Sequence, residues 1–244
     1  MKKKFWVVIG LIVLTFFLKQ SVFAKNEERP KGLDERGPLT KITFIHYKKA
    51  QAKPPRPGKP AKESSCYQFL AKGAKWKEIE PYWINPSNSG LPGSFANQAI
   101  DAGVTEWEKY AQTEIFGQGS LTNSASYNET LDNLNVASFG QYPNPNVIAI
   151  TSIWGYFSGP PQWRELVEWD ILFNTNFQWG DAKTNSSLMD LQNIATHELG
   201  HSAGMGDLYE TVCSAETMYG YSGYGETDKR DLNAGDIKGI QELY

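Results

Sequence analysis

The stretch that decides the fold is His197-Glu198-Leu199-Gly200-His201-Ser202-Ala203-Gly204-Met205-Gly206-Asp207. Positions i and i+4 lie on one face of a helix, so His197 and His201 can present their imidazole nitrogens to one metal ion. Glu198 lies beside the first imidazole, where a carboxylate can take a proton from a water molecule activated by the metal. Gly204 can adopt the positive φ that ends a helix and that other residues disfavour. The run therefore predicts a zinc-binding helix that ends at Gly204.

The third metal ligand has to be acidic if it follows the helix, because the chain has three histidines and none comes after His201. Asp207 is favoured, since the turn at Gly204 brings it back toward the two imidazoles. A zinc protease of the two-His, one-Glu type takes its glutamate from a later helix instead. Glu216 and Glu226 lie downstream of Asp207, in segments that lack the apolar periodicity of a helix. The alternatives that stay open are Glu210, Glu216, Glu226 and Asp228.

Apolar periodicity predicts the elements around this run. Leu191 and Ile194 fall at helical spacing upstream of His197, with Asp190 as a candidate acid of the first turn or cap. Residues 95–110 have the pattern of a long amphipathic helix. Two apolar segments, residues 146–153 and 168–174, have the pattern of β-strands.

With these residues in place, the sequence resembles the metzincin metalloproteases, and most closely their matrixin-like branch. The family motif is H-E-x-x-H-x-x-G-x-x-H, with Asp last in some bacterial members, and it is matched here by His197, Glu198, His201, Gly204 and Asp207. Residues 214–219 resemble the family's methionine turn, with Met218 beneath the metal. Residues 231–244 resemble its last helix, and the whole resemblance covers roughly residues 66–244.

The resemblance implies an α+β fold. It has a twisted, mixed but mostly parallel sheet of about five strands, three main helices, an active-site helix ending at Gly204, and a small C-terminal subdomain. It also implies that an extended substrate adds to the strand at residues 146–153 as to a sheet edge. Matrixins have proline where this chain has Gly220, so the wall of the substrate pocket is expected to differ. Tyr219 and Tyr221 are then candidates for pocket or transition-state contacts. A second, structural zinc held by histidines is not expected, because the domain has no spare histidine.

The N-terminal part of the chain differs in character from the rest. Residues 1–24 have the pattern of a secretory signal peptide, in which Lys2, Lys3 and Lys4 precede an apolar run and a small-residue cleavage site. The apolar run is shorter than the roughly twenty residues of a membrane span. Residues 25–65 include the proline-rich, basic stretch Lys53–Pro60, which cannot form a helix or a central strand. Export without a stable membrane span is therefore predicted, with residues 66–244 as the catalytic domain.

Charge separates these two parts. Residues 25–65 contain eleven Lys/Arg and five Asp/Glu, a net charge of +6, whereas residues 66–244 contain nine Lys/Arg and twenty-two Asp/Glu, a net charge of −13. The basic segment is either an extended linker or a pro-segment that lies against the acidic domain through salt-sensitive attraction. An acidic domain argues against a nucleic-acid partner. The expected partners are protein or peptide substrates, and the expected state is a monomer.

Cys66 and Cys213 are the only cysteines. In an exported protein they favour one disulfide bond, and the alternative is that the Cys66 thiolate ligates zinc in a latent form. The acidic residues Asp170, Asp181 and Asp190 are candidates either for holding Ca²⁺ or for a solvated surface.

The predicted function is that of a secreted zinc metalloendopeptidase, with one catalytic Zn²⁺ held by His197, His201 and Asp207. Glu198 is the general base that activates water for peptide-bond hydrolysis. Two alternatives remain. One is a non-catalytic binding module that keeps zinc for stability, and the other is a zinc peptidase of another clan with a different acidic third ligand.

Overall fold

The computed structural model describes residues 36–49 and 66–244, and these described residues belong to one compact unit. The predicted signal peptide at residues 1–24 lies outside the described residues, as does most of the basic segment at residues 25–65. Within the described ranges, no helix has the length and apolar character needed to cross a membrane.

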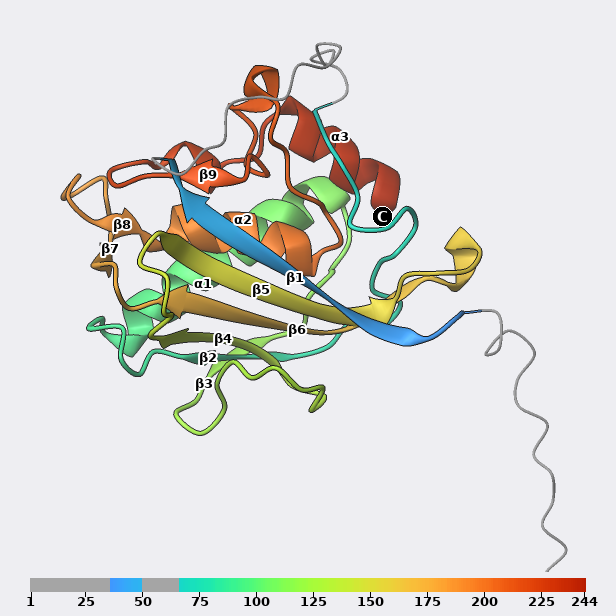
Figure 1. Ribbon diagram of the computed structural model, residues 1–244, viewed down its shortest axis with the longest axis horizontal. Helices are drawn as coiled ribbons and strands as arrows, with labels where there is room; N and C mark the ends of the chain where they lie inside the picture. Colours follow the sequence, from blue (N-terminus) through green and yellow to red (C-terminus); the bar gives the residue numbers. More distant parts are fainter. Residues whose placement is uncertain (1–35, 50–65) are drawn as a thin grey trace, which may run out of the picture. The chain divides into compact units, whose positions relative to one another are not determined.

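The secondary structure alternates strands and helices (Figure 1). In chain order the elements are β1 (Leu39–Lys48), β2 (Tyr82–Asn85), α1 (Gly93–Ala111), β3 (Gly119–Leu121), β4 (Asn135–Gly140), β5 (Val147–Tyr156), η3 (Pro161–Trp163), β6 (Glu165–Asn174), β7 (Trp179–Gly180), β8 (Met189–Asp190), α2 (Leu191–Ser202), η4 (Thr211–Cys213), β9 (Tyr221–Ser222), η5 (Asp228–Arg230) and α3 (Ala234–Leu243). The predicted helix at residues 95–110 and both predicted strands are confirmed as α1, β5 and β6.

The main sheet has the strand order β3-β2-β4-β6-β5-β1-β9. Strands β3, β2, β4 and β6 are parallel to one another, β5 is antiparallel to β6, and β1 is antiparallel to β5. The five strands from β3 to β5 are the mixed, mostly parallel sheet that the sequence predicts. Together with the three helices they confirm the fold class. Beyond β5, the strands β1 and β9 enlarge the sheet to seven.

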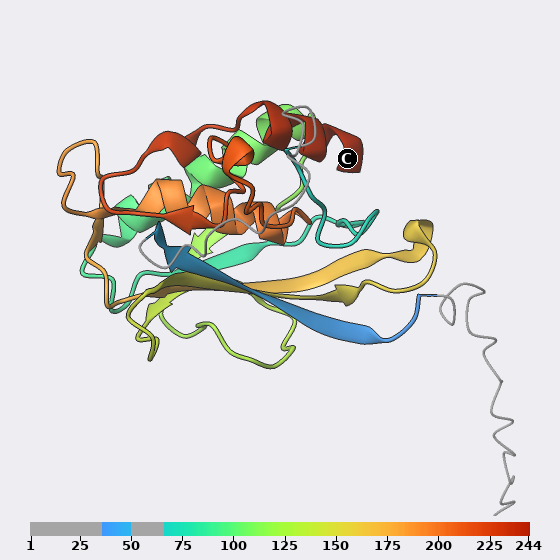
Figure 2. The same cartoon turned by 45° about the horizontal axis from the view of Figure 1, so that its top comes forward.

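Helices α1 and α2 cover one face of the sheet, as the turned view shows (Figure 2). Trp107 of α1 is fully buried, and its indole N–H donates to the carbonyl oxygen of Thr196 in α2 at 2.7 Å. Strands β5 and β6 are buried almost throughout, because helices cover one face and neighbouring strands both edges. After α2 the chain forms a small C-terminal region in which α3 packs against α1. This framework holds α2 rigidly over the centre of the sheet.

Strand β1 corrects the predicted domain boundary. Residues 39–48 pair with β5 from Leu39↔Tyr156 to Tyr47↔Val147, and with β9 at Tyr47↔Tyr221. A start of the folded domain at residue 66 is therefore too late, since part of the segment at residues 25–65 belongs to the sheet. β5 is also not an edge strand here, because β1 takes the edge that a substrate was expected to use. The proline-rich composition of residues 53–60 obscured the strand pattern that precedes it.

A disulfide bond joins Cys66 to Cys213, with their Cα atoms 5.3 Å apart and a separation of 147 positions in the sequence. The predicted pairing is confirmed, and the alternative of a Cys66 thiolate as zinc ligand is wrong. In the chain-entropy account, closing so long a loop stabilises the fold by on the order of 4–5 kcal/mol. The bond ties the start of the 66–244 segment to η4, between Asp207 and Met218.

Candidate metal centre

Helix α2 places His197 and His201 on one face. The helix begins at Asp190, whose carboxylate accepts from the backbone N–H of Asn193 at 2.8 Å, as the predicted N-cap should. It ends at Ser202, and Gly204 follows with φ +106°. A Cβ at Gly204 would lie 2.7 Å from the carbonyl oxygen of Ala74. Glycine is therefore required there both by backbone conformation and by space.

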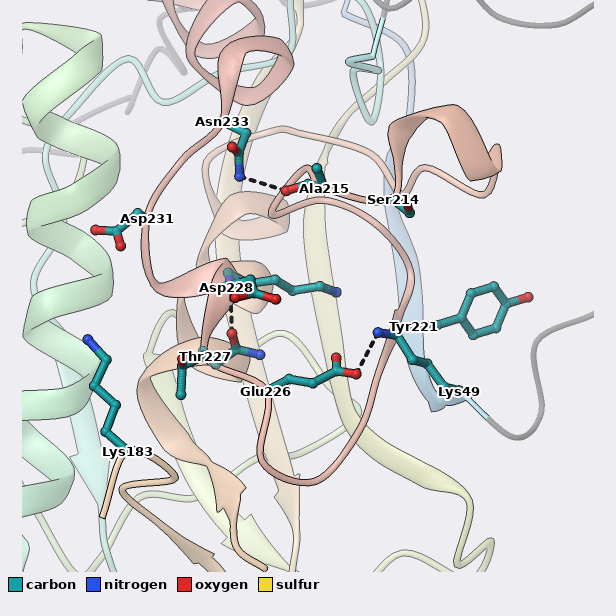
Figure 3. A pocket seen from close by; sticks show the side chains of 12 residues that line it. Lys49, Lys183, Ser214, Ala215, Tyr221, Glu226, Thr227, Asp228, Asp231 and Asn233 are labelled. Carbon is teal, nitrogen blue, oxygen red and sulfur yellow. Dashed lines mark hydrogen bonds and ion pairs between the residues drawn. The ribbon is translucent and has the colours of Figure 1, made fainter. Parts of the chain in front are cut away.

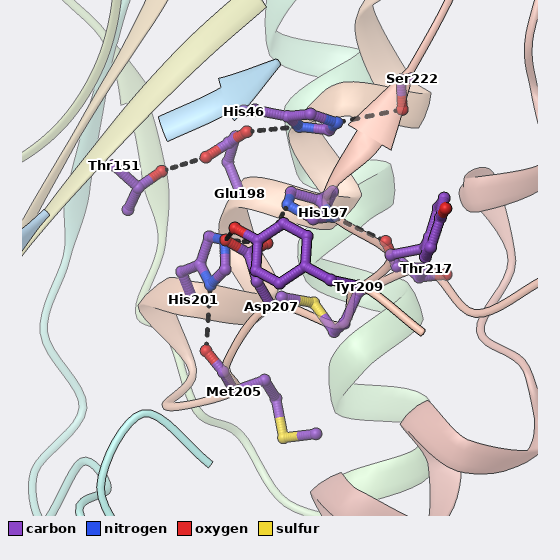
Figure 4. A network of polar contacts seen from close by, with 12 residues as sticks. His46, Thr151, His197, Glu198, His201, Met205, Asp207, Tyr209, Thr217 and Ser222 are labelled. Carbon is purple, nitrogen blue, oxygen red and sulfur yellow. Dashed lines mark hydrogen bonds and ion pairs between the residues drawn. The ribbon is translucent and has the colours of Figure 1, made fainter. Parts of the chain in front are cut away.

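Asp207 returns to the two imidazoles after this turn (Figure 4). Its Oδ1 lies 3.2 Å from His197 Nε2 and 3.3 Å from His201 Nε2. Tetrahedral ligands at 2.0–2.1 Å from a zinc ion are about 3.3 Å apart. His197 Nε2 and Asp207 Oδ1 are also buried atoms without a hydrogen-bond partner among the described residues. Buried polar atoms are normally satisfied, so this donor set fits a zinc ion.

Hydrogen bonds around the three residues orient them toward a common point. His197 Nδ1 donates to the carbonyl oxygen of Thr217 at 2.7 Å, and His201 Nδ1 donates to that of Met205 at 3.0 Å. A carbonyl oxygen only accepts, so each Nδ1 carries a proton and each Nε2 keeps its lone pair for a metal. The Tyr209 hydroxyl donates to Asp207 Oδ2 at 2.8 Å. Tyr209 is a contact that the sequence reasoning missed.

Burial and mutual charge set the ionisation of these groups. Burial lowers the pKa of His197 to about 4, which keeps the imidazole neutral as a metal ligand must be. Burial alone would raise the pKa of Asp207, but the neighbouring His201 and His197 outweigh it and hold that pKa well below its usual range. The donor set is thus two imidazoles and one carboxylate.

Met218 lies in the chain beneath α2 and is fully buried. A Cβ added to Gly200 would come within 2.3 Å of the Met218 sulfur, so this helix position has room only for glycine. The backbone N–H groups of Thr217 and Met218 donate to the carboxylate of Asp236 in α3, at 2.6 and 3.1 Å. The last helix therefore anchors the turn that also holds His197 through the Thr217 carbonyl.

Glu198 is fully buried next to His197, and both of its carboxylate oxygens are engaged (Figure 4). Thr151 of β5 donates to Oε2 at 2.5 Å, and His46 Nδ1 of β1 donates to Oε1 at 2.9 Å. His46 Nε2 is left to accept from the Ser222 hydroxyl at 3.1 Å. Burial raises the pKa of Glu198 to about 7. A carboxylate with a pKa near neutrality is suited to exchanging protons.

His46 corrects the expectation that the domain has no spare histidine. Its ring lies 4.0 Å from that of His197, centroid to centroid, and is almost completely buried. His46, His197 and Glu198 form one of two groups of three potential metal ligands in the described ranges, and the other is His197, His201 and Asp207. The alternation of residues 42–48 was the only local signal that could have placed His46 in a strand.

Tyr219 and Tyr221 follow Met218 in the chain, and Tyr221 lines a cavity of the structure. Both are largely buried, and their rings lie 5.7 Å apart. The Tyr221 ring also contacts that of Tyr209 at 5.6 Å. The hydroxyl that reaches Asp207 belongs to Tyr209. Tyr219 and Tyr221 stay predictions as pocket residues.

The acidic residues considered as alternative third ligands are not grouped with both histidines in the described part of the chain. Glu216 Oε2 accepts from the backbone N–H groups of Gly235 and Asp236, at 3.0 and 3.2 Å. Glu226 pairs with Lys49 at 2.5 Å. Glu210 and Asp228 join no such group either. Geometry therefore favours Asp207.

The three carboxylates considered for calcium do not form one site. Asp181 and Asp190 both bind the Arg230 guanidinium, Asp181 at 2.6 Å. Asp170 lies on β6, where its Oδ2 accepts from the backbone N–H of Asn128 at 3.1 Å. Calcium binding stays a prediction without a common site for these residues.

A cavity of about 510 Å³ lies beside the centre (Figure 3). Its lining includes Lys49, Tyr221, Glu226 and Lys229, but none of the three candidate metal ligands. This cavity therefore does not open onto the three candidate ligands, which β1 covers.

Comparisons with known proteins find sequence similarity to one family of proteins. Residues 160–244 match the family model of matrixin. Human Matrilysin is 41% identical over 76 residues, which cover 31% of this chain and 26% of that protein. Mouse Stromelysin-1 is 25% identical over 231 residues, which cover 91% of this chain and 43% of that protein. The chain thus spans less than half the length of these curated relatives.

A crystal structure of metalloproteinase-II from Bacteroides fragilis is similar over 71% of this chain and 54% of that one, with 11% identity and a TM-score of 0.37. The matched family segment contains His197, His201 and Met218. On these sequence matches, residues 160–244 are similar to the matrixins, the branch of the metzincins that the sequence resembles.

Proposed function

We propose that this protein is a zinc-dependent endopeptidase. The observation that supports it most directly is the donor set of His197, His201 and Asp207, whose nearest atoms are separated as the ligands of one tetrahedral zinc ion are. When bound, zinc supplies Lewis acidity, which lowers the pKa of a water molecule and stabilises negative charge developing on a carbonyl oxygen.

Glu198 is the proposed general base. It follows His197 directly in α2, and its carboxylate lies on the side of the centre that faces β5 and β1. Its pKa near 7 allows it to take a proton from the attacking water and return it to the leaving amine. Thr151 of β5 holds Oε2, so the oxygen proposed to handle the proton is Oε1, which His46 of β1 contacts in this structure.

Tyr209 is a proposed positioning residue. It donates to the Asp207 oxygen that does not face the histidines, and so fixes the orientation of that carboxylate. Outer contacts of this kind typically change metal affinity or activity by about 10–100-fold when removed.

Export of the protein is also part of the proposal. The disulfide between Cys66 and Cys213 supports it, because such bonds persist mainly in oxidising compartments. Its substrates would be proteins or peptides, since the chemistry of the centre is that of amide hydrolysis.

One observation favours a second candidate, a non-catalytic binding module that keeps zinc for stability. His197, Glu198 and His201 are at most 1% exposed, and both Glu198 oxygens are occupied. A catalytic zinc site normally keeps one position open to water. The two candidates differ in whether this closed arrangement can open.

The test compares zinc content and peptide hydrolysis in the full chain and three variants. Wild type should bind one zinc, and Asp207→Asn should lose it, whereas Glu210→Gln should keep it as the matched control. Glu198→Gln should keep zinc and lose chelator-sensitive hydrolysis by about 10²–10⁴-fold. Zinc retained in Asp207→Asn would exclude Asp207 as the ligand. A zinc-loaded protein without hydrolysis, in wild type and in the β1 variants described below, would identify the binding module.

A further inference from the structure

Strand β1 passes directly over the metal centre and is paired on both sides. It runs antiparallel to β5, with Phe44 opposite Thr151 and His46 opposite Ala149. Its C-terminal end runs parallel to β9, with Lys48 opposite Ser222. Figure 1 shows β1 lying along β5 on the side where the five-stranded sheet would otherwise end. It therefore fills a slot between an antiparallel strand and a parallel one.

Side chains on one face of β1 cover the catalytic groups. The Phe44 ring stacks on His201 with centroids 3.8 Å apart and an interplanar angle of 8°. The His46 ring covers His197 and donates to the free oxygen of Glu198. In this arrangement each carboxylate oxygen of the proposed base already accepts a hydrogen bond, and the residue is completely enclosed, so bulk water does not reach it.

The slot that β1 fills has the shape that an extended peptide requires. Peptides commonly bind by adding a strand to the free edge of a sheet, where main-chain hydrogen bonds supply affinity. With β1 removed, β5 would present such an edge beside Glu198 and the metal ligands. A peptidase acting on this centre therefore needs the space that β1 occupies.

The attachment of β1 is weak compared with that of the other long strands. Of its ten residues only His46 is buried, and the first three are exposed. Three basic side chains in β1 or next to its ends pair with acidic residues of the 66–244 segment. The pairs are Arg36 with Glu165, Lys41 with Glu129 and Lys49 with Glu226. Such partly exposed pairs contribute little each and weaken with salt. In sequence, β1 is joined to the disulfide-anchored part of the chain only through residues 50–65.

We propose that β1 is an intramolecular inhibitor strand, which occupies the peptide-binding slot as a substrate would and blocks the general base with His46. This inference rests on the proposed peptidase function and adds its regulation. Hydrolysis then requires β1 to leave the slot, and the activity of the full chain reports the fraction of molecules in which it has left.

The experiment compares zinc-loaded full chains in a fluorogenic peptide assay. Phe44→Ala/His46→Ala removes the ring on His201 and the contact with Glu198. It should raise kcat/KM at least about tenfold, since a lost buried contact shifts the docking equilibrium by roughly that factor. Thr40→Ala, an exposed change in the same strand, should match wild type. Glu198→Gln added to the double variant should abolish the gain.

A second readout is independent of zinc and of activity. Backbone amides of β1 should exchange with deuterium at least about tenfold faster in the double variant than in wild type, while those of β6 exchange unchanged. Should the double variant fold poorly, Arg36→Glu/Lys41→Glu loosens β1 from its exposed side. That charge reversal should raise activity by about threefold.

The outcomes separate the two proposals. If wild type hydrolyses peptide in a chelator-sensitive way and neither β1 variant is faster, β1 is an ordinary strand of the sheet and the inhibitor role is overturned. If no variant hydrolyses peptide although zinc is bound and β1 exchanges faster, the peptidase function is what fails.

Discussion

Strands β1 and β6 flank β5 on its two sides, and both pair with it antiparallel along most of its length. Opposite Thr151 of β5 lie Phe44 on β1 and Ile171 on β6. Ile171 is fully buried within the core, whereas Phe44 is half-buried over His201. The two strands therefore have the same backbone partner and different surroundings.

The next row of the same face repeats the contrast. Ala149 has His46 on one side and Phe173 on the other. Phe173 packs against Phe139 and Trp179 in the core, while His46 is hydrogen-bonded to Glu198. Backbone pairing thus does not by itself make a strand part of the core. β6 is held in place by the packing of its side chains in the core. β1 is held by backbone pairing with its neighbours and by contacts with the centre, as a bound peptide would be.

Truncating Ile171 or Phe44, the two residues opposite Thr151, should give the largest difference, measured as the loss in the free energy of unfolding. Ile171→Ala leaves a cavity in the core and should lower the free energy of unfolding by about 2–5 kcal/mol. Phe44→Ala should cost less than half as much, because β1 can leave while the rest of the fold stays intact. Chemical denaturation of both variants measures this. Equal losses would make β1 as integral to the fold as β6.

Removal of zinc should also distinguish the strands. The candidate ligands are enclosed beneath β1, so extraction by EDTA has to wait for β1 to move. Phe44→Ala should speed zinc transfer to the chelator by about tenfold, following the change in the open population. Thr40→Ala is the control, and a colorimetric zinc dye follows the rate. A rate that is the same in all three chains would show that β1 does not limit access.

Thr43 of β1 and Asp170 of β6 lie opposite Ser152 of β5. Of these two residues, only Asp170 is expected to make the stability of the fold depend on pH. Burial raises the pKa of Asp170 to about 8, against about 3.9 in an unfolded chain. The folded chain therefore keeps a proton that the unfolded chain releases between about pH 4 and pH 8, and stability falls as pH rises through this window. Asp170→Asn should flatten that slope in chemical denaturation, and Thr43→Ala should leave it unchanged. A slope unaltered by Asp170→Asn would contradict the assignment.

Salt should have the smallest effect. Ionic strength screens the pairs that Arg36, Lys41 and Lys49 make with the body. Raising it should increase peptide hydrolysis by about threefold, since exposed pairs contribute up to about 1 kcal/mol each. In Lys41→Gln/Lys49→Gln the increase should shrink. An increase of the same size in that variant would place the salt effect elsewhere.

The parts of the centre that the sequence could predict are local in the chain. His197, His201, Gly204 and Asp207 lie within one helix and one turn, so their spacing nearly determines their geometry. The strong apolar patterns of α1, β5 and β6 were likewise sufficient to predict these elements. Cys66 and Cys213 could be paired because no other cysteine competes.

What could not be predicted depends on pairing between distant segments. His46 meets Glu198 across 152 residues and Ser222 across 176. β1 is as long as β5 and β6, but it is more polar and did not stand out beside a proline-rich stretch. Thr151 contacts Glu198 only because β5 is packed under α2. None of these contacts has a signature within a local window of sequence.

The central claim is that β1 has to leave its slot before the centre can act, and a reversible lock tests it most directly. Thr43 and Ser152 are direct partners across β1 and β5 with their hydroxyl oxygens 3.2 Å apart, so the sulfur atoms of cysteines at these two positions can approach each other. Thr43→Cys/Ser152→Cys is made in a chain that also carries Phe44→Ala, with Phe44→Ala alone as the control for the reductant. We predict that the oxidised lock hydrolyses peptide at least about tenfold more slowly than the same protein after reduction. Equal rates before and after reduction would contradict the account.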